Sequence, residues 1–338
     1  MTGSVPPSGA PLVSIVTPCW NAERYLAATY RSLRAQTMTN WEWLVADDGS
    51  TDGGVALLRR IAARDARVRL VPGGHTGLPA VGRNRALART SGRFVAFLDA
   101  DDVWHPEKLE RQLAFLRTHR GVAMTYSFVQ EFWSPEWGRR EAPPVFWPRV
   151  RLPDDPFAFL LRRGNVVCTS SLLVRRAVVV QLGGFDEDPE LCAVEDHDFL
   201  LRAVRWFRLG RTPGVLVRYR LHPANVTRTI DFGRTEALRR KLEERGDLRG
   251  RAGAGFLSAY YLKRAERGLA GMPGVAVRRD FLRALACDPL DPRRWAAGVM
   301  AAVLPSRLLG AAYRGTKRLQ RHLEGRAASP HHLGGQME

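Results

Sequence analysis

The sequence predicts an α/β protein, in which a mostly parallel sheet is flanked by helices and followed by a helical C-terminal region. Over residues 12–127, short apolar runs alternate with segments of helical periodicity, as in proteins whose helices pack on such a sheet. Acidic clusters follow two of these runs, at 47–52 and 99–102. Because ligands bind at the carboxyl ends of parallel strands, we expect both clusters to share one edge of the sheet.

Each expected strand is an apolar, often β-branched run that ends at Pro, Gly or an acidic turn. The expected helices between them have apolar residues three or four positions apart, or begin at a proline, which a first helical turn tolerates. Strands are expected at 12–18, 41–46, 68–72, 94–98 and 122–127, and helices at 22–36, 55–63, 79–90 and from Pro106 onward.

The rest of the chain is less regular. The segment 134–157 is rich in Pro and Trp and is expected to be a surface excursion. A strand is expected at 165–176, a helix from about Glu195, and a strand over 214–227 that runs into a polar loop. The expected parts are a flexible N-terminus (1–11), an α/β domain (12–230), a basic helical region (231–325) and a disordered tail (326–338).

The chain of 338 residues is 45% hydrophobic and 25% charged, which fits one large or two modest globular domains. Its formal net charge of +18 favours contact with anions, such as nucleotides, nucleic acid or an acidic membrane surface. More than half of this excess lies in residues 231–338, which hold 21 Lys and Arg against 11 Asp and Glu. This region is therefore expected to have a role of its own.

The four cysteines, Cys19, Cys168, Cys192 and Cys287, are far apart, so a disulfide framework or a zinc site is not expected. The first residues lack the pattern of a signal peptide, and a cytoplasmic location is expected. No stretch reaches the roughly 18–20 unbroken apolar residues of a spanning helix. The nearest, 295–313, is expected either to contact an anionic membrane peripherally, on its inner face, or to pack within a helical subdomain.

Three carboxylates, Asp99, Asp101 and Asp102, follow the apolar run 94–98. Residues two apart on a strand face the same way, so Asp99 and Asp101 can converge on one cation. Their oxygen ligands suit Mg²⁺ or Mn²⁺, and Mg²⁺ typically lets substrate phosphates complete its shell. The alternative is an acidic turn that caps the next helix.

Other polar residues also have two interpretations. Asp47 or Asp48 can accept a hydrogen bond from a base or a ribose, whereas Asp52 is a natural helix cap. Arg83 can contact a diphosphate, or it can lie on a solvated helix face.

Two later segments carry candidates for catalysis or metal binding. One carboxylate of the pair Glu195 and Asp196 can act as a general base, although acidic residues at a helix start are also favoured by the helix dipole. His222 can bind metal or phosphate, or it can be an ordinary turn histidine.

These motifs occur in an order that resembles the family 2 glycosyltransferases. The resemblance is carried by "VSIVTPCWNAERYLAATYRSLRAQT", "WEWLVADDGSTD", "GRNRALARTSGRFVAFLDADDVWHPEKLE", and "GGFDE" followed by "EDHDFLLR". It covers about residues 12–225 and is dense over 12–111. It implies the GT-A fold, a Rossmann-like sheet with flanking helices, a nucleoside-diphosphate sugar as donor, and Mg²⁺ or Mn²⁺ as cofactor. Cys19, His197 and the 134–157 insertion depart from the family's pattern.

The resemblance also implies a role for particular residues. Asp196 is the implied catalytic base, and Glu195 lies on the acceptor side. Asp101 is the better candidate for direct metal ligation, with Asp99 and His222 beside it. The implied donor-nucleotide residues are Thr17, Pro18, Asp47, Asp48, Arg83, Asp99 and Ala100.

The reaction implied by the resemblance is an inverting transfer of a sugar to an acceptor hydroxyl, in polysaccharide, cell-envelope or glycoconjugate biosynthesis. A nucleotidyltransferase on a similar sheet is an alternative, but "TPCWNAERY" offers no Gly- and Lys-rich phosphate loop. A nucleic-acid-binding protein is suggested by the charge, but the acidic clusters would face the ligand, so no nucleic-acid partner is expected. A dinucleotide dehydrogenase would need a Gly-x-Gly-x-x-Gly motif after the first strand.

Overall fold

The chain divides into two compact units, Met1–Lys241 and Leu242–Glu338. The predicted N-terminal segment, the 134–157 excursion and the 326–338 tail lie mostly or wholly outside the described residues, and the predicted domain boundaries stay predictions. The computed structural model describes residues 9–134, 146–147, 152–153, 155–225, 232–269, 276–289, 299–301, 303, 304, 308 and 313.

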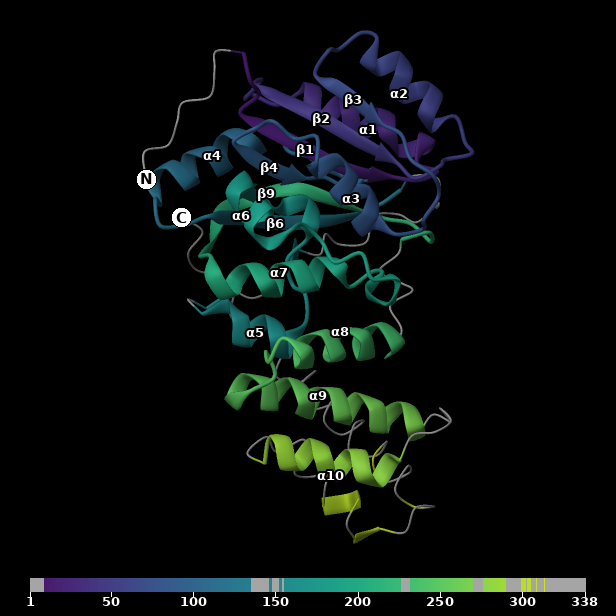
Figure 1. Ribbon diagram of the computed structural model, residues 1–338, viewed down its shortest axis with the longest axis vertical. Helices are drawn as coiled ribbons and strands as arrows, with labels where there is room; N and C mark the ends of the chain where they lie inside the picture. The colour runs from purple at the N-terminus through teal and green to yellow at the C-terminus, as the bar shows by residue number, and fades with distance from the viewer. Residues whose placement is uncertain are drawn as a thin grey trace, which may run out of the picture. The chain divides into compact units, whose positions relative to one another are not determined.

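The first half of the sheet consists of β1 (Val13–Cys19), β2 (Trp41–Asp47), β3 (Val68–Val71) and β4 (Phe94–Phe97). β1 lies between β2 and β4, β2 also pairs with β3, and all three pairings are parallel, as predicted. The connecting helices are α1 (Glu23–Arg34), α2 (Gly54–Ala62) and α3 (Pro79–Leu87). This arrangement brings the carboxyl ends of β1, β2 and β4 to one edge of the sheet (Figure 1).

The second half consists of β5 (Val103–Trp104), β6 (Met124–Trp133), β7 (Phe146–Trp147), β8 (Leu173–Arg175) and β9 (Leu209–Leu221). β8 runs antiparallel to both β4 and β6, whereas β6 and β9 are parallel. The order of the described strands is β3-β2-β1-β4-β8-β6-β9-β5, with β7 paired to β6. The α/β fold class is therefore confirmed, and its parallel part is β3-β2-β1-β4 together with the β6-β9 pair.

The strand expected at 165–176 is mostly not a strand. Thr169–Ser171 form a 3₁₀ turn, η2, and only β8 is extended and paired. The Ser171 hydroxyl donates to the carbonyl oxygen of Cys168 at 2.7 Å. Such local hydrogen bonds from hydroxyl side chains compete with strand pairing, and an apolar-run pattern does not register them. The strand expected over 214–227 corresponds to β9, which spans Leu209–Leu221 and so begins and ends earlier than expected.

The remaining helices of the first unit are α4 (Lys108–Thr118), α5 (Pro156–Arg163), α6 (Arg176–Leu182) and α7 (Glu195–Trp206), with the short 3₁₀ helix η3 (Pro189–Leu191) before α7. α7 begins at the expected residue. α8 (Phe232–Glu244) precedes α9 (Gly250–Leu269) and α10 (Val277–Cys287), so the part of the C-terminal region that the structure describes is helical, as predicted. None of the helices in the described part of the chain combines the length and the hydropathy that a transmembrane segment needs.

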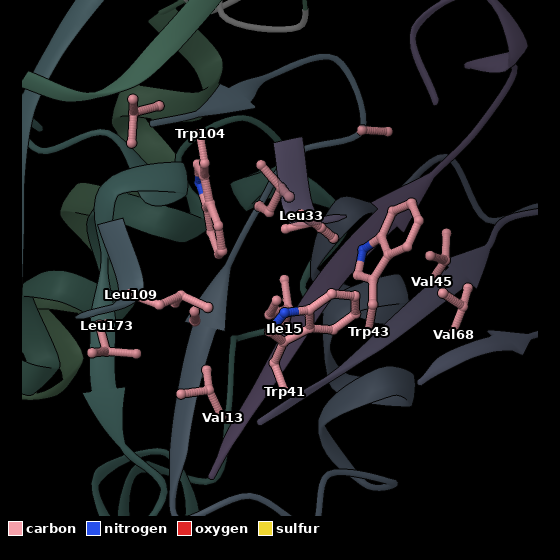
Figure 2. Packing of buried hydrophobic residues seen from close by; sticks show 14 of the residues in the cluster. Val13, Ile15, Leu33, Trp41, Trp43, Val45, Val68, Trp104, Leu109 and Leu173 are labelled. Atoms are coloured by element: carbon pink, nitrogen blue, oxygen red, sulfur yellow. The ribbon is translucent and has the colours of Figure 1, made fainter. Parts of the chain in front are cut away.

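The core of the first unit packs around β1 and β2. Ile15, Trp41 and Trp43 belong to one cluster of buried side chains that also includes Leu33 of α1 (Figure 2). The indole N–H of Trp43 donates to Thr17 Oγ1 at 2.8 Å, so the ring is buried without an unsatisfied donor. The central strands are thus held together by one apolar cluster and by a hydrogen bond between β2 and β1.

Shortening Ile15 tests this core. Ile15 is fully buried on the central strand β1, so Ile15→Ala should lower the free energy of unfolding, measured in urea, by about 2–5 kcal/mol. Val180→Ala is the control: Val180 is 69% exposed, and its truncation should change stability by no more than about 0.5 kcal/mol. Equal effects of the two substitutions would contradict this account of the core.

Candidate active site

A cavity of about 750 Å³ lies at the edge of the sheet where β1, β2 and β4 end. The start of α7 and the residues that follow β9 complete its wall. Segments distant in the sequence therefore meet there, as the strand-end argument predicted. The predicted site residues that line the cavity are Pro18, Asp48, Arg83, Asp99, Ala100, Asp101, Glu195, Asp196 and His222.

Two predicted donor-site residues, Thr17 and Asp47, do not line this cavity. Thr17 is fully buried and accepts the hydrogen bond from Trp43. The Asp47 carboxylate accepts from the backbone N–H groups of Gly49 and Ser50, at 3.1 and 3.2 Å, and so closes the turn after β2. Both side chains therefore bind neighbouring parts of the protein at the strand ends and do not face the cavity.

Asp48 is held by the loop after β3. Its carboxylate accepts from the Thr76 hydroxyl at 2.8 Å, from the Thr76 backbone N–H at 3.0 Å and from the Gly77 backbone N–H at 2.8 Å. The His75 ring stacks on Trp20, a cavity-lining residue that is 55% exposed, with 5.0 Å between ring centroids. This end of the cavity offers a flat aromatic surface next to a fixed carboxylate.

Arg83 bridges two carboxylates across the cavity wall. Its guanidinium donates to Glu195 Oε1 at 2.7 Å and to Asp99 Oδ1 at 2.9 Å, and its side chain is only 6% exposed. Burial works against a charged arginine, but the charges of Asp99 and Glu195 outweigh it and raise the pKa of Arg83. Arg83 was predicted to lie near a diphosphate. It does line the cavity, but both terminal nitrogens of its guanidinium are hydrogen-bonded to carboxylates of the protein.

Asp196 lines the cavity at the start of α7. Its Oδ2 atom accepts from Asn165 Nδ2 at 2.9 Å and from Thr169 Oγ1 at 3.0 Å, and its Oδ1 atom accepts from the His197 backbone N–H at 2.7 Å. Burial raises the pKa of Asp196 above its ordinary value. His197 points away: its Nε2 atom lies 3.2 Å from the Leu160 carbonyl oxygen, and burial lowers its pKa to about 4.

Asp101 and His222 are in contact with each other at the cavity wall. His222 Nε2 lies 2.8 Å from Asp101 Oδ2, the Asn225 amide lies 3.4 Å from the same oxygen, and the Tyr25 ring stacks on the His222 ring. In the described part of the chain, no group of three or more His, Cys, Asp and Glu side chains is arranged as a metal site. Asp101 with His222 nevertheless fits Mg²⁺ or Mn²⁺, since Mg²⁺ takes only one or two protein carboxylates and completes its shell with phosphate and water.

Several wall and supporting residues were not singled out from the sequence. Thr169 was assigned to a strand, and Asn225 was assigned only to the 214–227 strand that runs into a polar loop. The loop "GGHTG" contained a signal, because glycines on either side of His75 and Thr76 allow close approach of the backbone. The residues missed are Trp20, Tyr25, His75, Thr76, Asn165, Thr169 and Asn225.

Comparison with known proteins supports the sequence resemblance. The family model described as glycosyl transferase family 2 matches residues 14–181. EpsE of Bacillus subtilis, named as a glycosyltransferase, is 30% identical over 196 residues, which cover 58% of this chain and 67% of EpsE. TuaG of the same organism, named as a teichuronic acid biosynthesis glycosyltransferase, is 44% identical over 117 residues, 35% of this chain and 46% of TuaG. The chain thus spans under half of TuaG and about two thirds of EpsE.

Solved structures share the fold. The S. aureus TarS 1–349 structure in complex with UDP aligns with a TM-score of 0.58 and 20% identity, over 92% of this chain and 91% of that one. The mannosyltransferase PcManGT from Pyrobaculum calidifontis aligns with a TM-score of 0.53 and 18% identity, over 93% of this chain and 81% of that one. With the sequence matches and the strand-end cavity, these alignments lead to one conclusion: the chain belongs to glycosyltransferase family 2 and has the GT-A-like fold.

Proposed function

We propose that this glycosyltransferase moves a sugar from a nucleoside-diphosphate sugar to an acceptor hydroxyl, with inversion at the anomeric carbon. The observation that carries the proposal is the convergence, on one cavity, of a partly buried carboxylate at a helix start, a carboxylate–histidine pair and a carboxylate held by a loop. The names of TuaG and of WfgD of Escherichia coli, a glucosyltransferase acting on a diphosphoundecaprenol-linked sugar, favour a role in cell-envelope polysaccharide or glycoconjugate biosynthesis.

The donor is proposed from two kinds of support. TarS is described in complex with UDP and with UDP-GlcNAc, and PcManGT in complex with GDP-Man and Mn²⁺. In this chain, the exposed Trp20 ring beside the fixed carboxylate of Asp48 offers stacking and hydrogen bonding to a base at one end of the cavity. The sugar and diphosphate would then extend toward Asp101 and Asp196.

Asp101 and His222, with Asp99 beside them, are the residues proposed to hold Mg²⁺ or Mn²⁺. When bound, such a cation offsets the negative charge that grows on the departing diphosphate. The Tyr25 ring stacks on the His222 ring, and the Asn225 amide nitrogen contacts the Asp101 carboxylate, so each member of the pair has a neighbour that holds it.

Asp196 is the proposed general base. It takes the proton of the acceptor hydroxyl while that oxygen forms a bond to the anomeric carbon, and the bond from that carbon to the diphosphate oxygen breaks with its electrons. Attack opposite the leaving group inverts the configuration. The raised pKa of Asp196 makes it a better proton acceptor than an exposed aspartate, and the reaction rate should rise as pH passes upward through that pKa.

The alternatives are less well supported. A nucleotidyltransferase would require a phosphate loop that the β1–α1 connection lacks, and the matches in sequence and fold are to glycosyltransferases. A nucleic-acid ligand would face a cavity lined by seven carboxylates, so no nucleic-acid partner is proposed; they belong to Glu23, Asp48, Asp52, Asp99, Asp101, Glu195 and Asp196.

The C-terminal region is proposed to contact the cytoplasmic face of an anionic membrane peripherally, where a lipid-linked acceptor would lie. Residues 231–338 carry 21 Lys and Arg against 11 Asp and Glu, and the apolar 295–313 segment lies mostly outside the described residues. The alternative remains a solvated basic face on a packed helical subdomain.

The membrane proposal is tested by co-sedimentation with vesicles of phosphatidylcholine containing phosphatidylglycerol. The full chain should bind, binding should weaken as salt is raised, and a chain that ends at residue 289 should bind at least tenfold more weakly. Vesicles of phosphatidylcholine alone are the control. Equal binding by the full and shortened chains would contradict a role for the region after 289.

Calorimetric titration tests the donor and the metal. UDP, GDP and TDP are titrated with and without Mn²⁺, and one of them should bind at least tenfold more tightly with Mn²⁺. Asp101→Ala should remove that gain, whereas Glu107→Ala, an exposed carboxylate six residues away, should keep it. If UDP, GDP and TDP bind to Asp101→Ala and to Glu107→Ala equally well with and without Mn²⁺, the role of Asp101 is structural.

Replacing the proposed base tests the reaction. Asp196→Asn should lower turnover by about 10²–10⁴-fold, because general base catalysis typically contributes that much, while UDP binding remains. Turnover is measured as nucleotide released from UDP-glucose, UDP-GlcNAc or GDP-mannose with water as acceptor. Glu190→Gln, at an exposed acidic residue of η3, is the matched control. Equal turnover by wild type and Asp196→Asn would overturn the assignment of the base.

A further inference from the structure

The two oxygens of the Asp196 carboxylate have unequal hydrogen bonding. Oδ2 accepts two side-chain hydrogen bonds, from Asn165 Nδ2 at 2.9 Å and from Thr169 Oγ1 at 3.0 Å. Oδ1 accepts one, from the His197 backbone N–H at 2.7 Å. A carboxylate oxygen has two lone pairs, so Oδ2 is saturated and the free acceptor capacity lies on Oδ1.

Both side-chain donors are themselves fixed. The Asn165 Oδ1 atom accepts from the Val167 backbone N–H at 3.0 Å, which directs the amide nitrogen toward Asp196. Thr169 is 5% exposed and opens the η2 turn, which is closed by the Ser171 N–H to the Cys168 carbonyl oxygen at 2.9 Å. Donors held in this way lose little freedom when they bind a charged oxygen. The Thr169 hydroxyl acts on Asp196 by lowering its pKa.

Ser170, the next residue of the turn, contacts the segment that follows β4. Ser170 Oγ accepts from the Asp99 backbone N–H at 3.0 Å, and the Ser170 carbonyl oxygen accepts from the Trp104 indole N–H at 2.9 Å. The η2 turn thus contacts the loop after β4 and the start of α7 at once. It lies where it can set the position of Asp196 relative to Asp99.

The charges around Asp196 compete. Burial raises the pKa of Asp196, the positive charge of Arg83 and the hydrogen bonds from Thr169 and the His197 N–H lower it, and the negative charge of Asp99 raises it. Glu195 precedes it on α7, and the buried Cys168 thiol, whose own pKa is raised by burial, lies beside η2. Among these groups, Thr169 is a neutral donor that can be removed without altering the net charge of the site.

We propose that Thr169 and Asn165 are positioning residues for Asp196. They bind Oδ2, so that the carboxylate stays ionised and Oδ1 is the oxygen that takes the proton. The inference rests on the proposed function, in which Asp196 is the base. It adds that the segment 165–169, which precedes β8, determines both the direction and the proton affinity of that carboxylate. Thr169 and Asn165 act through Asp196 and need not touch the reacting atoms.

The test removes each hydrogen-bond donor to Asp196 and compares the result with the loss of a similar hydroxyl that does not bind Asp196. Thr169→Val removes the hydroxyl at nearly constant volume, Asn165→Ala removes the amide, and Thr169→Ser keeps a hydroxyl. Ser171→Ala is the control, because it removes a buried hydroxyl of the same turn that binds Cys168 rather than Asp196. The first readout is the pKa of Asp196 in the full chain, from ¹³C NMR of labelled aspartate carboxyl groups, with the resonance assigned by its loss in Asp196→Asn.

The second readout is the pH dependence of nucleotide release from whichever sugar nucleotide turns over. Losing a donor to the ionised carboxylate should raise its pKa, so Thr169→Val should move both the NMR titration and the acidic limb of the rate profile upward by about one pH unit. Asn165→Ala should move them in the same direction. Thr169→Ser and Ser171→Ala should leave both near their wild-type values.

Two results would overturn the proposal. One is an unchanged Asp196 titration in Thr169→Val and in Asn165→Ala, since a purely structural role would lower the rate equally at every pH. The other is an equal shift in Ser171→Ala, which would assign the effect to the turn as a whole. If Asp196→Asn leaves turnover unchanged, the proposed function fails, yet the NMR titration still decides whether the donors control the carboxylate.

Discussion

The geometry of the cavity depends on one buried cation shared by two carboxylates. Arg83 joins Asp99, in the loop after β4, to Glu195, at the start of α7, through contacts of 2.9 and 2.7 Å. Two carboxylates buried near each other would repel, and removing one partner from a buried pair typically costs about 3–5 kcal/mol. The arginine therefore lets both lie at one wall, and Asp196 is placed with them because it follows Glu195 on the helix.

The acidic clusters contribute to structure as well as to the cavity. Asp47 closes a turn, and Asp102 is fully buried with Oδ1 accepting the Arg220 backbone N–H at 3.0 Å. Burial raises the pKa of Asp102 well above its ordinary value. Asp47 and Asp102 bind the protein's own backbone and do not line the cavity, whereas their neighbours Asp48 and Asp101 do line it. Carboxyl groups at these strand ends thus fix the loops that carry the cavity-lining carboxylates.

The sequence predicted most of the fold and the cavity wall, but not the contacts within the wall. Alternating apolar runs were enough for β1–β4, and the strand-end rule brought Asp48, Asp99 and Asp101 to one edge. The same rule does not say which of two adjacent aspartates turns outward, so Asp47 was grouped with Asp48. The partners of Asp196 come from a turn that was assigned to a strand, because spacing along the chain does not report hydrogen bonds across more than 25 residues.

The two ends of the cavity are held by different parts of the chain. The carboxylate of Asp48 is bound by the loop after β3, whereas the carboxylate of Asp196 is bound by the segment before β8. Each end can therefore acquire substitutions that alter its own ligand without moving the other, provided that Arg83 keeps its contacts with Asp99 and Glu195. Such modularity would let one scaffold change its donor and its acceptor in separate evolutionary steps, and it marks two loops for independent exchange in enzyme engineering.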